Sequence, residues 1–374
     1  MDLTQRILYH QVQPQATQTT YTARDQVDFL ISVGEGRSLV PNSVRILGDL
    51  LVNETGNTVS TGGIRLDPNV GAHAFLDSVN TNMSSVGNIE NLQNYPRYVA
   101  MDAAASLNEL DMCNGSNQCE LRAPTVITTT DYCQGITSDL TTGTNPTNNV
   151  DFSIKPMCCL NKMDSRSSGL PMERSGMISL QLILASNQSA LYGQKQDAAT
   201  NYVLTNLRCT FKSVVDNKDN QPVVMQIINN FKTNVLSGTA TISTNVDAVC
   251  DSVSVNFIEN SRESVNVFNT YELQNIKGLA EVEYIFNSQT NSLITYPIRD
   301  TTEMLERFIS SMRNTSHNQV SVDKFRANQA FALGLDFEEP VSLVNNRFTM
   351  QLTSTVDAGN ALNAFLYFHS RRAI

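Results

Sequence analysis

The chain has 374 residues, of which 41% are hydrophobic and 17% are charged, and its formal net charge is -10. The apolar content excludes a largely disordered chain, and the length predicts two domains rather than one. The negative charge argues against direct binding to nucleic acid, which requires clustered cations, and no Lys/Arg run exceeds Arg371-Arg372.

The sequence also lacks the apolar segments that membranes and secretion require. No stretch reaches the roughly 18 consecutive apolar residues of a membrane-spanning helix, and the N-terminus has no apolar core of a signal peptide. We therefore expect a protein that is made and kept in the cytosol.

Residues 1–20 are predicted to form an N-terminal arm. Leu3, Ile7 and Leu8 can share one side of a short helical turn, and a Gln/Thr-rich tract follows as far as Thr20. Segments of this kind order on a partner, so the arm is expected to contact a neighbouring subunit or a membrane surface. The alternative is a frayed terminus.

The first domain, residues 21–216, begins with strands. Apolar residues alternate from Val27 to Val33, Gly34 to Gly36 form a turn, and a second strand runs from Val44 to Val52. From Asn91 to Leu110 the period becomes helical, with Pro96 in the first turn.

The segment from about 111 to 149 is rich in Thr, Asn, Gly and Cys and predicts a long exposed loop. Loops of this length are uncommon in compact domains unless they carry function. Within it, Thr125–Thr129 reads as a short strand. Further strands are expected at 150–154, 178–184 and 207–211, and a polar turn at 216–220 marks the domain boundary.

The second domain, residues 217–374, opens with apolar Pro222–Phe231 and continues through strands at 239–244, 253–257 and 282–286. A helix starts at Thr301 or Thr302, either of which can cap it, and Arg313 lies near its end. Its apolar residues have helical spacing and predict core packing rather than a ligand site: Met304, Leu305, Phe308, Ile309 and Met312.

The end of the chain repeats a pattern from its middle. In each copy a helix precedes a short strand, a long alternating strand and a closing strand. The first copy begins near Val150, and the second begins near Gln329 with the apolar strand 331–335. A turn at Glu338-Glu339-Pro340 then precedes the alternating strand 348–356 and the closing strand 362–368. The repeat predicts two copies of one all-β unit.

The cysteines indicate neither zinc binding nor a disulfide framework. There are seven, and no CxxC or HxxxH spacing accompanies them. Adjacent Cys158 and Cys159 lie in a strand-like run, where neighbours point to opposite faces. Cys113 and Cys119 flank a plausible hairpin loop and are the one pair that could bond, while free thiols are the simpler expectation.

No catalytic constellation is evident either, so we expect no enzyme activity, cofactor or metal. The four histidines are not at metal-ligand spacing from one another: His10, His73, His317 and His369. His369 is expected to be a satisfied histidine at a rim or interface. Glu281 and Glu283 share the polar face of one strand, and the loops at Asp111 and Asp131 lack calcium-loop spacing.

The stretch FSIKPMCCLN at 152–161, followed by strands at 175–184 and 202–207 with ALYG at 190–193 between them, resembles the end of a first jelly roll. Over nearly the whole chain, the pattern resembles the double jelly-roll major capsid proteins of tailless icosahedral viruses and lipid-containing phages. The resemblance implies an all-β fold of two tandem eight-stranded jelly rolls, each with a short flanking helix.

The family resemblance also implies a function. Such proteins form homotrimers whose six lobes make a pseudo-hexamer that tiles an icosahedral shell around the genome. The implied partners are neighbouring capsomers, minor capsid or penton proteins, and an inner membrane reached through the N-terminal arm. The protein would be synthesised in the host cytoplasm and located in the virion. Alternatives are a vertex or receptor-binding spike protein, or a glycan-acting hydrolase on a paired jelly roll.

Overall fold

The computed structural model describes these parts of the chain: 7–54, 64–107, 109–112, 114–122, 150–163, 169–193, 200–215, 222–235, 239–265, 267–286, 294, 296–312, 322–326, 330–354 and 361–374. The chain divides into two compact units. Unit 1 comprises residues 1–96, 109–228 and 371–374, and unit 2 comprises residues 97–108 and 229–370. The predicted boundary at 216–220 lies outside the described residues, so the limits 21–216 and 217–374 stay a prediction.

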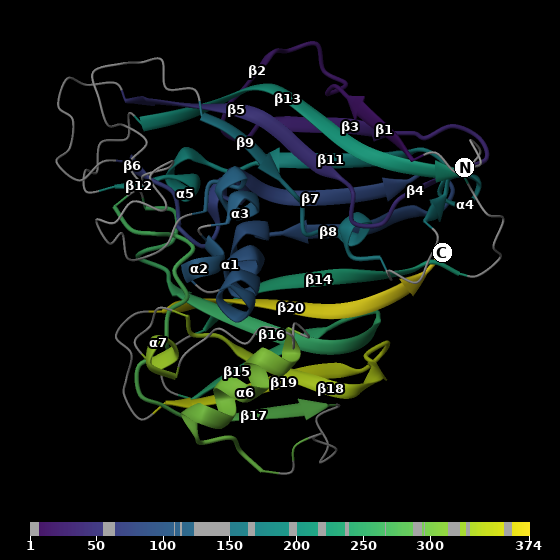
Figure 1. Ribbon diagram of the computed structural model, residues 1–374. Helices are drawn as coiled ribbons and strands as arrows, with labels where there is room; N and C mark the ends of the chain where they lie inside the picture. Colours follow the sequence, from purple (N-terminus) through teal and green to yellow (C-terminus); the bar gives the residue numbers. More distant parts are fainter. Residues whose placement is uncertain are drawn as a thin grey trace. The chain divides into compact units, whose positions relative to one another are not determined.

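Unit 1 contains two antiparallel sheets. In the first, the strands are connected in the order β10-β4-β13-β5-β9. Strands β4 and β5 pair with successive stretches of one edge of β13, and β1 and β2 pair with its other edge (Figure 1). Their bounds are β1 Leu8–Val12, β2 Thr20–Tyr21, β4 Arg37–Leu39, β5 Arg45–Glu54, β9 Val150–Ile154, β10 Leu170–Pro171 and β13 Thr200–Val215.

The second sheet of unit 1 has the order β3-β11-β7-β8. Its strands are β3 Gln26–Ile31, β7 Leu76–Met83, β8 Gly87–Gln93 and β11 Ile178–Leu184. Alternate residues of β3 and β11, such as Phe29 and Leu180, are fully buried, as the sequence pattern predicts. Each such side chain contributes roughly 1.5–3 kcal/mol of hydrophobic stabilisation. A small sheet pairs β6 Ile64–Arg65 with β12 Tyr192–Gly193.

Short helices complete unit 1. They are η2 Gly71–Phe75, α2 Glu109–Met112, α3 Gly115–Cys119, η3 Cys159–Asn161, α4 Met172–Ser175 and α5 Asn187–Ala190. The longer helix α1 Tyr95–Ser106 starts in unit 1 and continues in unit 2. Pro96 lies in its first turn, as predicted. None of the helices in the described part of the chain combines the length and apolar character that a membrane-spanning helix needs.

Unit 2 is also built from two antiparallel sheets, ordered β14-β20-β16-β18 and β15-β19-β17. Their bounds are β14 Val224–Val235, β15 Ala240–Asn245, β16 Val249–Glu259, β17 Leu279–Phe286, β18 Leu333–Ser342, β19 Arg347–Ser354 and β20 Leu362–Ala373. A bridge between Ile298 and Val282 adds a further position next to β17. The helices are α6 Thr301–Ser311 and α7 Val322–Arg326.

The two units share one topology. In unit 1, β1 and β2 together make the first of eight positions, and the other seven in chain order are β3, β5, β7, β8, β9, β11 and β13. In unit 2, the eight positions are β14, β15, β16, β17, Ile298, β18, β19 and β20. In both units the first sheet joins positions 1-8-3-6 and the second joins 2-7-4-5. Helices α1 and α6 both fall between positions five and six. The predicted repeat of a helix followed by three strands is therefore confirmed.

Several predicted elements need correction. Ile7 and Leu8 do not form a helical turn, because Leu8–Val12 pairs with β13 from Ser213 to Cys209. The arm thus joins the first sheet through residues 8–12 and, at its end, through Thr20. The strands β7 and β8 were not predicted, because their outward positions are Asn-rich and their apolar alternation is weak. Helix α6 is preceded by Asp300 at the N-cap position, and no side-chain cap bond forms there.

The predicted turn at Glu338-Glu339-Pro340 lies inside β18 as a bulge, since Asp336 pairs with Ser252 and Val341 pairs with Cys250. The positive φ of Glu338, 59°, belongs to this bulge. Other predictions fall outside the described residues: the helical position of Leu3, the thiol of Cys113, the strand 125–129, the loop at Asp131, and the positions of Arg313 and His317.

Candidate functional site: a buried charge network in unit 1

The start of the predicted long loop is ordered into two short helices, α2 and α3, instead of a hairpin. Asn114 caps α3 by accepting a hydrogen bond from the Asn117 backbone N–H at 3.0 Å, and the Asn117 side chain donates to the Asp111 carbonyl at 2.8 Å. Cys119, at the end of α3, is an exposed free thiol. The candidate Cys113–Cys119 disulfide is therefore not formed.

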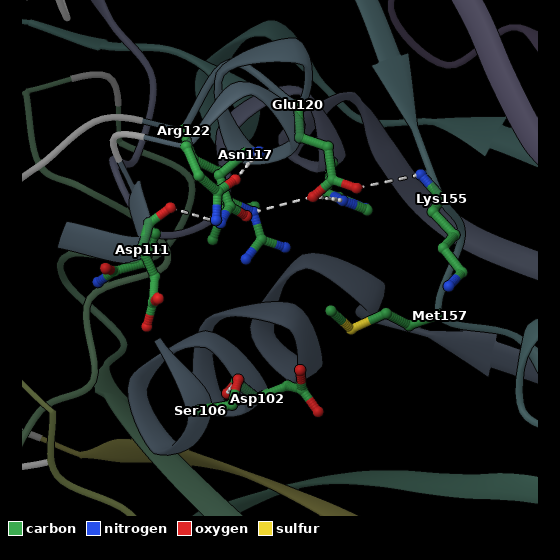
Figure 2. A network of polar contacts seen from close by, with 12 residues as sticks. Asp102, Ser106, Asp111, Asn117, Glu120, Arg122, Lys155 and Met157 are labelled. Carbon is green, nitrogen blue, oxygen red and sulfur yellow. Dashed lines mark hydrogen bonds and ion pairs between the residues drawn. The ribbon is translucent and has the colours of Figure 1, made fainter. Parts of the chain in front are cut away.

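Glu120 follows α3 and is the centre of a buried charge network (Figure 2). Its Oε2 atom lies 3.3 Å from His73 Nε2 and 3.2 Å from Arg122 Nε. Its Oε1 atom accepts the backbone N–H of Lys155 at 3.4 Å. His73 is fully buried and Arg122 is 3% exposed, so the carboxylate neutralises charge that has little access to water.

The pKa of Glu120 reflects this environment. Burial alone would raise it, but the neighbouring His73 side chain, the Arg122 guanidinium and the Lys155 N–H together lower the pKa to about 2. Glu120 is therefore ionised throughout the neutral range.

Tyr95 extends the network to the start of α1. Its hydroxyl lies 2.6 Å from His73 Nδ1 and accepts the Met157 backbone N–H at 3.0 Å. Burial raises the pKa of Tyr95 well above its usual value, so the phenol stays protonated.

The network joins the two ends of residues 123–149. Glu120 and Arg122 come immediately before that segment, and Lys155 and Met157 come shortly after it. The backbone is packed closely here: the Ala72 N–H donates to the Glu120 carbonyl at 2.7 Å, and a Cβ at Gly71 would lie 2.2 Å from the same oxygen. The arrangement therefore acts as a structural clamp that holds residues 120–122 against residues 155–157.

Unit 1 has a second buried carboxylate, Glu90 on β8. Its Oε2 accepts the Cys159 N–H at 2.7 Å, and its Oε1 accepts the Ile228 N–H at 2.9 Å. Burial raises the pKa of Glu90, and the two backbone N–H groups and Lys162 lower it in part, which leaves it at about 7. Glu90 thus holds the turn after β9 against the start of β14, whose residues up to Ile228 belong to unit 1.

The residues highlighted by the sequence are dispersed. His10 lies 2.7 Å from Ser213 Oγ and stacks on Phe211, and His369 is buried rather than at a rim, with Nε2 3.4 Å from Ser254 Oγ. Cys158 and Cys159 are buried free thiols in a turn, not in a strand.

Glu281, on the polar face of β17, pairs with Arg299 at 3.1 Å. No group of three or more His, Cys, Asp or Glu residues that could hold a metal occurs in the described ranges. The sequence did not reveal Glu120 or Glu90, because most of their partners are distant in the chain, and the ion pair of Arg122 with Glu120 becomes recognisable only once both side chains are known to be buried.

Comparison with known proteins defines the fold. The sequence matches no known family model and no curated protein. Among solved structures, the Faustovirus major capsid protein is similar at 8% identity and a TM-score of 0.64, covering 99% of this chain and 90% of that chain. PBCV-1 VP54, fitted into a reconstruction of the virophage Sputnik, is similar at 10% identity and a TM-score of 0.63, covering 99% and 95%.

The mavirus major capsid protein is similar at 9% identity and a TM-score of 0.50, covering 97% of this chain and 86% of that chain. At these identities the likeness concerns the fold, and it extends over almost the whole chain. Together with the repeated strand order of the two units, it shows that this chain has the all-β double jelly-roll fold that its sequence pattern resembles.

Proposed function

We propose that this chain is a major capsid protein, a structural subunit that associates with copies of itself to form a virion shell. The observation that carries this proposal is the duplicated jelly-roll topology along a single chain, shared end to end with solved major capsid proteins. The buried Glu120 and Glu90 hold separate chain segments together through hydrogen bonds and ion pairs, which is a structural role that suits a building block.

The duplication supports a particular assembly. Three copies of a chain with two similar jelly rolls supply six similar lobes, so a closed homotrimer can occupy a sixfold-like position in a shell. Neighbouring capsomers and penton proteins would surround it. Subunit contacts of this obligate kind bury about 2,000–5,000 Å².

Light scattering coupled to size exclusion tests the trimer. We expect a mass of three chains that persists on dilution from micromolar to nanomolar concentration, and electron microscopy should show pseudo-hexagonal particles. A stable monomer at these concentrations would refute the proposal. Turnover of a glycopeptide or polysaccharide by the purified protein would favour the hydrolase alternative.

The N-terminal arm supplies a matched pair of deletions. Removing residues 1–6 leaves all of β1 in place, whereas removing residues 1–12 exposes the edge of β13 that β1 covers. We expect the shorter deletion to keep the trimer and abolish contact with neighbouring capsomers or an inner membrane. The longer deletion should also lower thermal stability. Loss of the trimer with the shorter deletion would contradict this role for the arm.

A further inference from the structure

The outward face of the first sheet of unit 1 carries two rows of like charge. Arg45 and Asp49 lie on β5, four residues apart, and Asp151 and Lys155 lie on and just after β9. Because side chains alternate along a strand and Ile46 and Ile154 are buried, these four point away from the core. We call Arg45 with Lys155 the basic row, and Asp49 with Asp151 the acidic row.

Each row places like charges beside each other. Asp49 and Asp151 are direct cross-strand partners, an arrangement that destabilises an isolated sheet. In the basic row, burial lowers the pKa of Lys155 and the neighbouring Arg45 guanidinium lowers it further, while Glu120 raises it.

Within the described residues, Arg45, Lys155, Asp49 and Asp151 form no ion pair. The only polar side-chain partner of Asp49 there is Asn206, which donates a hydrogen bond to it. As far as the described residues are concerned, the charges of both rows are therefore available to a partner.

The rows have a simple symmetry. On β5 and on β9 alike, the positive and negative residues are separated by four positions, about 13 Å, and Leu47 and Ser153 form the pair midway between them. Consider a two-fold axis that lies parallel to the sheet, runs perpendicular to the strands and passes over Leu47. Rotation about this axis places a second copy of the face against the first, with each strand opposite the same strand of the other copy. The basic row of one copy then lies opposite the acidic row of the other.

We propose that this face binds the same face of a second copy of the chain through such a two-fold axis. Arg45 of one copy then meets Asp49 of the other, Lys155 meets Asp151, and the two Leu47 side chains meet at the axis. The contact is isologous, so each pair forms twice. This inference deepens the proposed function by assigning one of the contacts between copies, and it rests on that function.

The acidic row favours a second copy over a polyanion. Phosphates drawn to the basic row would meet the two carboxylates only about 13 Å away, whereas an identical face satisfies both rows at once. Arg208 on β13 lies opposite Leu47, and its side chain is long enough to reach the acidic row of either copy. Contacts made from partly exposed ion pairs are weak and sensitive to salt, as suits a contact between preformed oligomers.

Two charge-swap variants test the contact. Arg45→Glu with Lys155→Glu makes both rows acidic, and Asp49→Lys with Asp151→Lys makes both rows basic. We expect each variant alone to lose at least about tenfold in the association constant between oligomers at 50 mM salt, because four attractive pairs become repulsive. An equimolar mixture should regain association, since the two faces are now complementary. Sedimentation velocity measures all three samples.

The control is Glu338→Lys with Glu339→Lys, which changes the net charge as much as the basic variant does but lies on the exposed bulge of β18. It should leave association unchanged. Circular dichroism checks that each variant folds; if either double variant does not, the single changes Arg45→Glu and Asp49→Lys are compared and mixed in the same way.

A mixture that associates no better than its components, or a wild-type protein without a salt-sensitive association step, overturns the inference. The trimer is measured separately in 1 M salt, where this contact is screened. If the protein is a trimer in 1 M salt but the mixed variants do not regain association, the proposed function stands and only this contact is refuted. If no trimer forms in 1 M salt, the result counts against the proposed function alone.

Discussion

The charge network around Glu120 yields a quantitative prediction for Glu120→Gln. The amide keeps the shape of the side chain but removes the charge that balances Arg122, which is 3% exposed. Breaking a buried ion pair by removing one partner costs about 3–5 kcal/mol. The pKa gives a second estimate: a carboxyl that titrates near 4.5 when unfolded and at about 2 when folded contributes about 3 kcal/mol at neutral pH. We therefore expect a loss of about 3 kcal/mol at pH 7.

The sign of the pH dependence follows from the same values. Because folding lowers the pKa of Glu120, its stabilising contribution is complete above about pH 4.5 and is lost as the pH falls toward 2. The difference between wild type and Glu120→Gln should shrink from about 3 kcal/mol at pH 7 to about 2 kcal/mol at pH 3.5. Adding Arg122→Met to the variant should recover part of the loss, because the buried guanidinium that lost its counter-charge is then removed.

The assay is urea denaturation followed by circular dichroism, since the chain contains no tryptophan. Hydrogen exchange in peptides covering 114–122 assigns the transition to unit 1. The matched control is Glu281→Gln, which breaks the exposed pair with Arg299 and should cost less than about 1 kcal/mol. A loss below about 1 kcal/mol for Glu120→Gln, or an equal loss at pH 3.5 and 7, would refute the reasoning.

Three further predictions concern unit 1. Folding raises the pKa of Glu90 to about 7, so the free energy of unfolding of the wild type should fall by up to about 3 kcal/mol as the pH rises from 4.5 through 7, and Glu90→Gln should remove this dependence. Melting temperatures of the two proteins, measured between pH 5 and 8, should converge at the acid end. Parallel curves would contradict the assignment. Tyr202→Phe removes the hydrogen bond to the Ala185 carbonyl at 2.6 Å and should cost about 1–2 kcal/mol in urea denaturation, with no loss expected if that carbonyl finds water. Gly71→Ala should destabilise the protein by more than about 3 kcal/mol, because the φ of Gly71 is +59° and the new Cβ would clash with a backbone oxygen. In the control Gly115→Ala the new Cβ has no atom within 4 Å, so this variant should be neutral or slightly stabilised. Equal melting temperatures for the two variants would show that the backbone at Gly71 can shift to accommodate the Cβ.

The strongly periodic parts of the sequence predicted their structures well. The alternating residues of β3 and β11 and the apolar stripe of α6 are local patterns, decided by residues within one or two turns or pleats of each other. The repeat of a helix and three strands was visible for the same reason, and it correctly indicated two jelly rolls. Patterns too short or too polar failed: three apolar residues in the arm could not distinguish a helical turn from the strand β1.

Only the tertiary structure decided which strands pair and which charges meet. Strand β1 exists because Leu8 lies opposite Ser213, more than two hundred residues later, and the clamp exists because His73, Glu120 and Lys155 converge from three separate segments. No local signal encodes such contacts, since an ion pair depends on burial and distance in the folded chain. The sequence alone therefore determined the repeating β architecture, and the long-range packing of its strands determined the buried network and the charged face.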